Sequence, residues 1–129
     1  MTAAQLTKLR EALLRLHKAL VESERVSYEL TMGKIPTPNH FLHLLTTDPW
    51  FAWLHPLSLL IVSMDQALDT KRHPLDASQA AALRQQAEQL LVASEAGHGF
   101  SAHYYDALQR DPDVILTHAA VITLLKRGQ

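Results

Sequence analysis

The chain has 129 residues, 47% of them hydrophobic and 19% charged, which suits one globular domain that can bury a core of its own. Its 12 basic and 13 acidic residues give a formal net charge of −1 and are dispersed along the chain, so we expect neither nucleic acid nor an acidic membrane as a partner. The absence of cysteine excludes disulfides, thiolate chemistry and cysteine-ligated metals.

The composition favours helix throughout the chain. Leucine and alanine are abundant, glycine occurs only four times, and no stretch shows the alternating pattern of a strand. We therefore predict an all-α fold: a single-domain helical bundle over residues 1–129, with about five helices, three long and two shorter, around a central apolar helix. The N-terminus lacks a basic start followed by an apolar segment and a cleavage site, so we expect a cytoplasmic protein.

A first long helix is predicted from Thr2 to Gly33. Thr2 and Gln5 have the spacing of a capping box, and glycine commonly follows a helix end. Between these positions, leucines recur every three or four residues, as they do in a helix that packs against another helix: Leu6, Leu9, Leu13, Leu16 and Leu20. They could pack within one subunit or form a dimer, and we favour burial within the subunit.

The segment from Asp48 to Asp69 is the predicted central helix. Asp48 can cap its start, Pro49 suits its first position, and the residues that follow are apolar on nearly every side. We expect the rest of the chain to shield this helix almost all the way round. Pro56 should break or kink it near residues 53–55, and its polar interruptions argue against a membrane span.

Proline, aspartate and glycine divide the rest of the chain into further helices. These are predicted over about 38–46, 76–96, 100–109 and 112–126. Thr37, Asp76 and Asp111 stand where N-caps are needed, and Gly97 and Gly99 are expected to end the helix that begins after Asp76.

One stripe of polar residues runs along the predicted central helix. At helical spacing it contains His55, Ser58, Val62, Asp65 and Asp69. We favour the interpretation that the stripe is a narrow solvent edge, or that neighbouring helices satisfy its polar groups. The functional alternative is a small polar pocket with Trp50 and Trp53 as an aromatic wall. Its candidate ligand-binding residues are Trp53, His55, Ser58 and Asp65.

Eight histidines raise the question of a metal site. Di-iron bundles need a Glu-x-x-His pair on each of two helices, and the sequence has one such pair, Glu95 and His98, at a predicted helix end. His40 and His43 could share a ligand at i, i+3 spacing, although such a pair arises easily by chance. A His/carboxylate metal-binding bundle is therefore the third hypothesis, with no metal ligand assigned and no cofactor expected.

Two other hypotheses rank above the metal site. The chain lacks a glycine-rich phosphate loop and a G-x-S-x-G turn, which favours a non-catalytic protein over an enzyme, and no catalytic residue is assigned. The first hypothesis is a helical-bundle interaction or regulatory protein, with self-association as a homodimer through the first helix or exposed aromatic residues. The second is a small-molecule binding bundle that uses the polar stripe of the central helix.

Two stretches of the chain resemble a family of uncharacterised bacterial proteins of proteobacterial type. They are LLTTDPWFAWLHPLSLLIVSMDQALD, residues 44–69, and EAGHGFSAHYYDALQRDPDVILTHAAV, residues 95–121. With the region Ser27 to Leu30, they place most of the chain within the resemblance. The resemblance implies a bacterial, cytoplasmic, helical protein of unknown function, and it assigns no functional residue.

Overall fold

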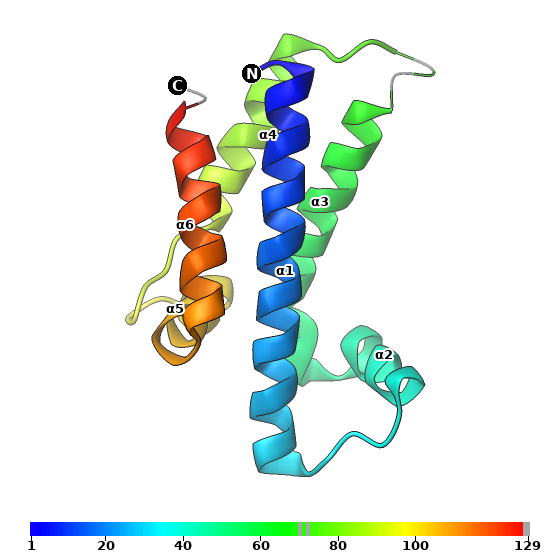
Figure 1. Cartoon of the computed structure of the whole chain (residues 1–129), viewed down its shortest axis with the longest axis vertical. Helices are drawn as coiled ribbons and strands as arrows, with labels where there is room; N and C mark the ends of the chain where they lie inside the picture. The colour runs from blue at the N-terminus through cyan, green and yellow to red at the C-terminus, as the bar shows by residue number, and fades with distance from the viewer. Residues whose placement is uncertain (70, 72, 128–129) are drawn as a thin grey trace.

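The computed structural model describes residues 1–69, 71 and 73–127, and the regular structure of these residues is entirely helical (Figure 1). The elements are α1 (Ala3–Met32), α2 (Pro38–Thr47), the 3₁₀ helix η1 (Pro49–Leu54), α3 (His55–Leu68), α4 (Ala77–Leu90), α5 (Phe100–Arg110) and α6 (Pro112–Arg127). The predicted all-α class is confirmed. The count of about five is not, because the described residues form six α-helices and one 3₁₀ helix.

Helix α1 begins and ends where local signals place it. The Thr2 hydroxyl accepts a hydrogen bond from the Gln5 backbone N–H at 3.2 Å, and the Gln5 side-chain oxygen accepts one from the Thr2 N–H at 2.8 Å, so the capping box is formed. Gly33 follows the last helical residue with φ of 99°, a conformation that favours glycine. The predicted helix is therefore confirmed at both ends.

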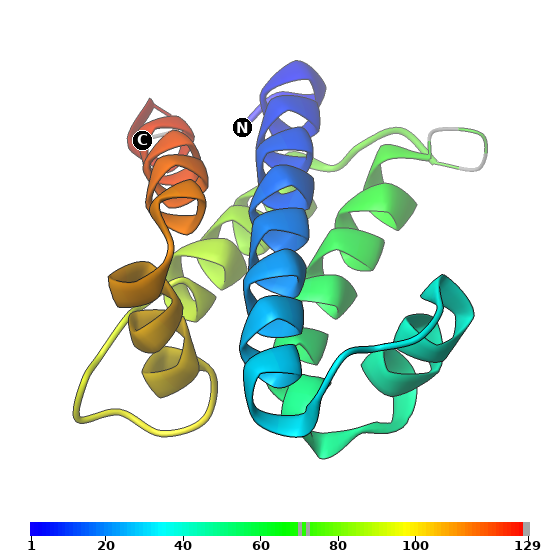
Figure 2. The same cartoon turned by 60° about the horizontal axis from the view of Figure 1, so that its bottom comes forward.

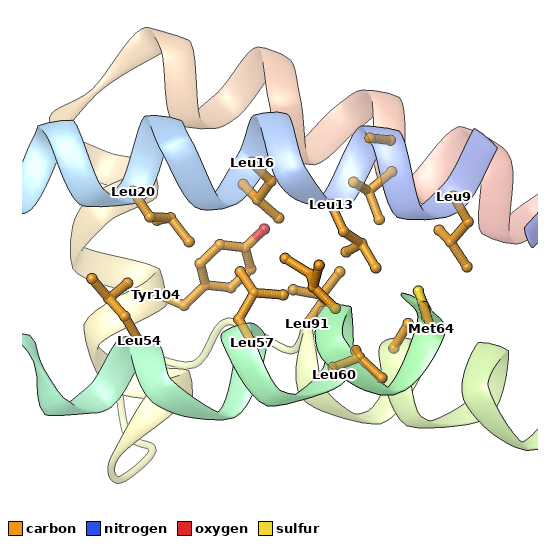
Figure 3. Packing of buried hydrophobic residues seen from close by; sticks show 14 of the residues in the cluster. Leu9, Leu13, Leu16, Leu20, Leu54, Leu57, Leu60, Met64, Leu91 and Tyr104 are labelled. Atoms are coloured by element: carbon orange, nitrogen blue, oxygen red, sulfur yellow. The ribbon is translucent and has the colours of Figure 1, made fainter. Parts of the chain in front are cut away.

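The leucines of α1 pack inside the subunit. Leu6, Leu9, Leu13, Leu16 and Leu20 all have 0% exposure. Four of them face α3 residues and Tyr104 in Figure 3, and α1 contacts η1, α3, α4, α5 and α6. A partner subunit could reach these leucines only if the bundle opened. Of the two arrangements considered for these leucines, a dimer and burial within one subunit, the structure shows burial within the subunit.

The centre of the bundle is α1, and the prediction that the apolar helix stands there is wrong. In Figure 1, α1 runs between α6 on one side and α3 on the other. The buried face of α3 consists of Leu57, Leu60, Ile61, Met64 and Ala67. Its opposite face leaves Leu59 53% and Val62 48% exposed, so the chain covers α3 on one side only. Apolar content showed that α3 is packed, but it could not show that α1 has neighbours on more sides.

The expected interruption before Pro56 is present. Residues Pro49–Leu54 form the 3₁₀ helix η1, and α-helical geometry begins only at His55. Pro56 thus lies in the first turn of α3, where its missing N–H breaks no helical hydrogen bond. By length and composition, Pro49–Leu68 is apolar enough to cross a membrane, and in this fold one face of it packs on α1 and α4.

Helix α4 ends earlier than predicted. It stops at Leu90, whereas Gly97 was expected to end it. Leu91 turns into the core, where it is 5% exposed, and the Ser94 N–H donates to the Ser101 carbonyl at 3.1 Å. The chain therefore leaves helical geometry to bury a leucine and to turn back toward α5. Both the burial of Leu91 and the turn toward α5 depend on contacts with other parts of the fold.

Candidate functional site

A pocket of about 710 Å³ lies between α1, α2, η1 and α3. Its polar lining consists of His17, Thr46, Thr47, Asp48, His55 and Ser58. Its apolar lining consists of Val21, Leu45, Pro49, Phe51, Ala52 and Leu54. The volume falls within the range of sites that hold small molecules, roughly 300–1,000 Å³.

The position of α2 forms this pocket. Pro36 and Pro38 keep the chain out of helical geometry after α1, so it crosses over before α2 begins. Helix α2 packs against η1, where Phe41 contacts Phe51 with ring centroids 5.7 Å apart, and it buries only Leu44. In both Figure 1 and Figure 2, α2 stands to one side of the bundle. Its C-terminal end becomes one wall of the pocket.

A histidine–serine pair forms part of the wall on the bundle side. His17 Nε2 of α1 and Ser58 Oγ of α3 lie 2.8 Å apart, within hydrogen-bond distance. Burial lowers the pKa of His17 from its ordinary value of 6.5, so the imidazole is neutral at pH 7. The pair is half-buried, and it presents a neutral ring and a hydroxyl to the pocket.

The α2 side of the pocket carries hydrogen-bond acceptors. The Thr46 and Thr47 hydroxyls donate to the His43 carbonyl at 2.9 and 2.7 Å, which leaves their oxygens to accept. Asp48 Oδ1 accepts from the Trp50 N–H at 2.9 Å and so caps η1. Within the described part of the chain, no lysine, arginine or histidine forms a salt bridge with Asp48.

The structure brings two of the four predicted site residues to the pocket. His55 and Ser58 line it, with His55 exposed to solvent. Asp65 lies farther along α3 and forms an ion pair with Arg10 of α1. Trp53 faces α5, where its ring stacks on His103 with centroids 5.3 Å apart and an interplanar angle of 14°. The stripe is thus divided between the pocket and an intrachain ion pair.

The expected aromatic wall of two tryptophans is not part of the pocket lining. Trp53 faces α5, as described above. Trp50 turns toward α1, where its indole N–H donates a hydrogen bond to Glu24 at 2.9 Å. Phe51 is the aromatic residue that lines the pocket, and it is 1% exposed.

Sequence reasoning missed the contribution of α1, although a weak signal for it exists. Arg10 and His17 are seven residues apart on α1, and their partners Asp65 and Ser58 are seven residues apart on α3. Two antiparallel helices in contact bring polar residues into register at such a spacing, because seven residues make about two turns. Other polar pairs on α1, such as Glu11 and Lys18, have the same spacing, so the spacing is consistent with the pairing of His17 and Ser58 but does not select it. The threonines of α2 offered no comparable signal.

A second polar cluster, the Glu24 cluster, lies outside the pocket lining. Glu24 is 5% exposed and accepts hydrogen bonds from Arg110 Nη2 at 2.8 Å and from the Trp50 indole at 2.9 Å. Arg110 Nε also donates to Ser23 Oγ at 3.1 Å. The cluster joins α1, η1 and α5, and both carboxylate oxygens of Glu24 have partners.

A buried tyrosine links α5 to α6. Tyr104 is 0% exposed, and its hydroxyl is hydrogen-bonded to His118 Nδ1. Burial raises the pKa of Tyr104 and lowers the pKa of His118, so both groups are neutral at pH 7.

The histidines considered for a metal do not come together. His40 and His43 lie on the exposed side of α2, and Glu95 and His98 lie in the connection between α4 and α5. Among residues 1–69, 71 and 73–127, no three side chains of the types that bind metals form a group.

Comparison of the chain with protein-family models, with curated proteins and with solved structures finds no match. The resemblance to an uncharacterised bacterial family therefore stays a prediction. Function has to be argued from the pocket itself.

Proposed function

We propose that this protein binds a small, mostly apolar molecule in the pocket between α1, α2, η1 and α3. The observation that supports this is a volume of about 710 Å³ whose lining combines apolar side chains with the His17–Ser58 pair. Ligand sites in proteins have this composition, since apolar walls supply affinity and a few polar groups fix orientation. Of the earlier hypotheses, the small-molecule binding bundle fits this lining best.

The roles of the lining residues follow from their burial. Phe51 and Leu54 are 1% and 3% exposed, so the core holds them in place and they form a fixed apolar floor. Val21 and Leu45 are half-buried and would be covered by a ligand. Ser58 and His17 would orient one polar group of the ligand, because each belongs to a long helix of the bundle.

Filling the pocket tests the proposal. Val21→Phe adds a ring where the ligand would lie, whereas Val26→Phe adds the same ring on α1 at a residue that is 46% exposed and outside the lining. A fragment library is screened on the unaltered protein by two-dimensional NMR, and shifted amides identify the site. Fragments that shift pocket amides should fail to bind Val21→Phe and should bind Val26→Phe unchanged. Binding that persists in Val21→Phe, or a screen that shifts no pocket amide, contradicts the proposal.

A second candidate, the interaction module, is favoured by apolar side chains that the fold leaves exposed. Leu30 is 84%, Met32 is 64% and Leu42 is 61% exposed. We propose self-association through these residues, since the leucines of α1 are already buried within the subunit. Sedimentation velocity over a concentration series should show a dimer that Leu30→Glu and Leu42→Glu abolish. A strict monomer at high concentration would remove this candidate.

A further inference from the structure

The charge of the pocket restricts what can enter it. Asp48 is the single carboxylate among the lining residues, and none of them is lysine or arginine. The imidazole of His17 is neutral because burial lowers its pKa. A phosphate or carboxylate would therefore meet a like charge with no ammonium or guanidinium to offset it, which is unfavourable in a partly desolvated site.

The free hydrogen-bonding capacity of the pocket points the same way. Thr46 and Thr47 have already donated their hydroxyl hydrogens to helix α2, whereas the single bond between Ser58 and His17 uses one of the two donor hydrogens of that pair. Only one carboxylate oxygen of Asp48 is used in capping η1. What is left over on the α2 side, at Thr46, Thr47 and Asp48, is acceptors, so a ligand group that binds there must bring donors.

We infer that the ligand is an apolar amine whose protonated nitrogen pairs with Asp48 and whose apolar body lies against Val21, Leu45 and Phe51. This inference rests on the proposed function and adds the chemical class of the ligand. An ammonium group supplies three donors and the charge opposite to Asp48. The apolar walls accept the rest of the molecule.

One substitution separates the charge of Asp48 from its structural role. Asp48→Asn keeps a side-chain oxygen that can accept from the Trp50 N–H, and asparagine is as good an N-cap as aspartate. Asp76→Asn is the matched control, because Asp76 caps α4 through an equivalent bond to the Ser78 N–H, also at 2.9 Å, outside the pocket. If both variants melt at the temperature of the unaltered chain, the caps of η1 and α4 are kept.

The experiment titrates the full chain with three probes of similar shape: phenylbutylamine, phenylbutanol and phenylbutyrate. At pH 8 an alkylamine is protonated and ordinary imidazoles are neutral. Two-dimensional NMR gives each dissociation constant from pocket amides. We expect the amine to bind about tenfold more tightly than the alcohol, the carboxylate to bind most weakly, and added salt to weaken only the amine. Asp48→Asn should reduce amine affinity to that of the alcohol, and Asp76→Asn should leave it unchanged.

The outcomes distinguish the inference from the proposal beneath it. If the alcohol binds the pocket as tightly as the amine, or if Asp48→Asn leaves amine binding unchanged, the pocket still binds small molecules but the amine inference fails. If the carboxylate binds best, the inference fails in the same way. If none of the three probes shifts pocket amides, the inference and the proposed function both fail.

Discussion

Two of the polar contacts that helix α1 makes with its neighbours differ in which hydrogen-bonding atoms they leave free. In the Glu24 cluster, a buried carboxylate has a partner on each oxygen, and none of its residues lines the pocket between α1, α2, η1 and α3. At His17 and Ser58, one hydrogen bond joins two half-buried groups at the edge of a pocket. The first contact fixes η1 and α5 against α1, and the second leaves polar atoms available. Burial of polar groups on one helix can therefore serve stability in one place and recognition in another.

The largest effect is expected at the Glu24 cluster. Glu24→Ala removes the acceptor of two hydrogen bonds, one of them from a guanidinium, and should lower the free energy of unfolding by about 2–3 kcal/mol. Urea denaturation measures this. Glu22→Ala is the control, because Glu22 is exposed and pairs with Arg25 one turn away, so its loss should cost less than about 0.5 kcal/mol. Equal costs for the two variants would show that the cluster is not structural.

The second prediction concerns the contact at the pocket. Ser58→Ala removes a neutral hydrogen bond and should lower the free energy of unfolding by only about 1 kcal/mol. Affinity for any ligand found in the pocket should fall severalfold, as titration by NMR would show. Ser63→Ala, on the same helix and outside the pocket, should leave affinity unchanged. A large loss of stability with no loss of affinity would reverse the distinction between the two contacts.

The smallest effect depends on pH. Burial lowers the pKa values of His17 and His118, so between each lowered value and about 6.5 the unfolded chain binds more protons than the folded one. Stability should therefore be constant with respect to these groups above pH 6.5 and should fall as the pH drops through 6.5. Because both rings are only half-buried, we expect this loss to be smaller than the loss caused by Ser58→Ala. Urea midpoints at pH 7.5 and 5.5 measure it, and His17→Gln should show a smaller loss than the unaltered chain.

Local signals predicted most of the fold, and non-local ones account for the errors. Thr2, Gly33 and Pro56 act within one turn of the helix, so the capping box, the end of α1 and the break before α3 followed from the sequence. The end of α4 was missed because Leu91 leaves the helix to enter a core that other helices form. The central position was assigned to α3 because apolar content measures how much of a helix is packed, not how many neighbours it has.

Only part of the candidate site was predicted, again because local patterns are visible in a sequence and contacts between helices are not. Ser58 and His55 came from a periodic pattern within one helix, which a sequence displays directly. His17 and Asp48 depend on the register between α1 and α3 and on where α2 returns, and neither is a local property. The matched seven-residue spacings on α1 and α3 are consistent with this register but do not select it.

The loose attachment of α2 has a consequence for how the pocket exchanges its contents. Because α2 buries only Leu44 and packs against η1, moving it outward breaks few apolar contacts and leaves the leucines of α1 in place. Its backbone amides should exchange hydrogen with solvent sooner than those of α1. A molecule could then enter and leave the pocket when α2 moves outward, while the rest of the bundle stays folded. The rate of dissociation would depend on the motion of this ten-residue helix.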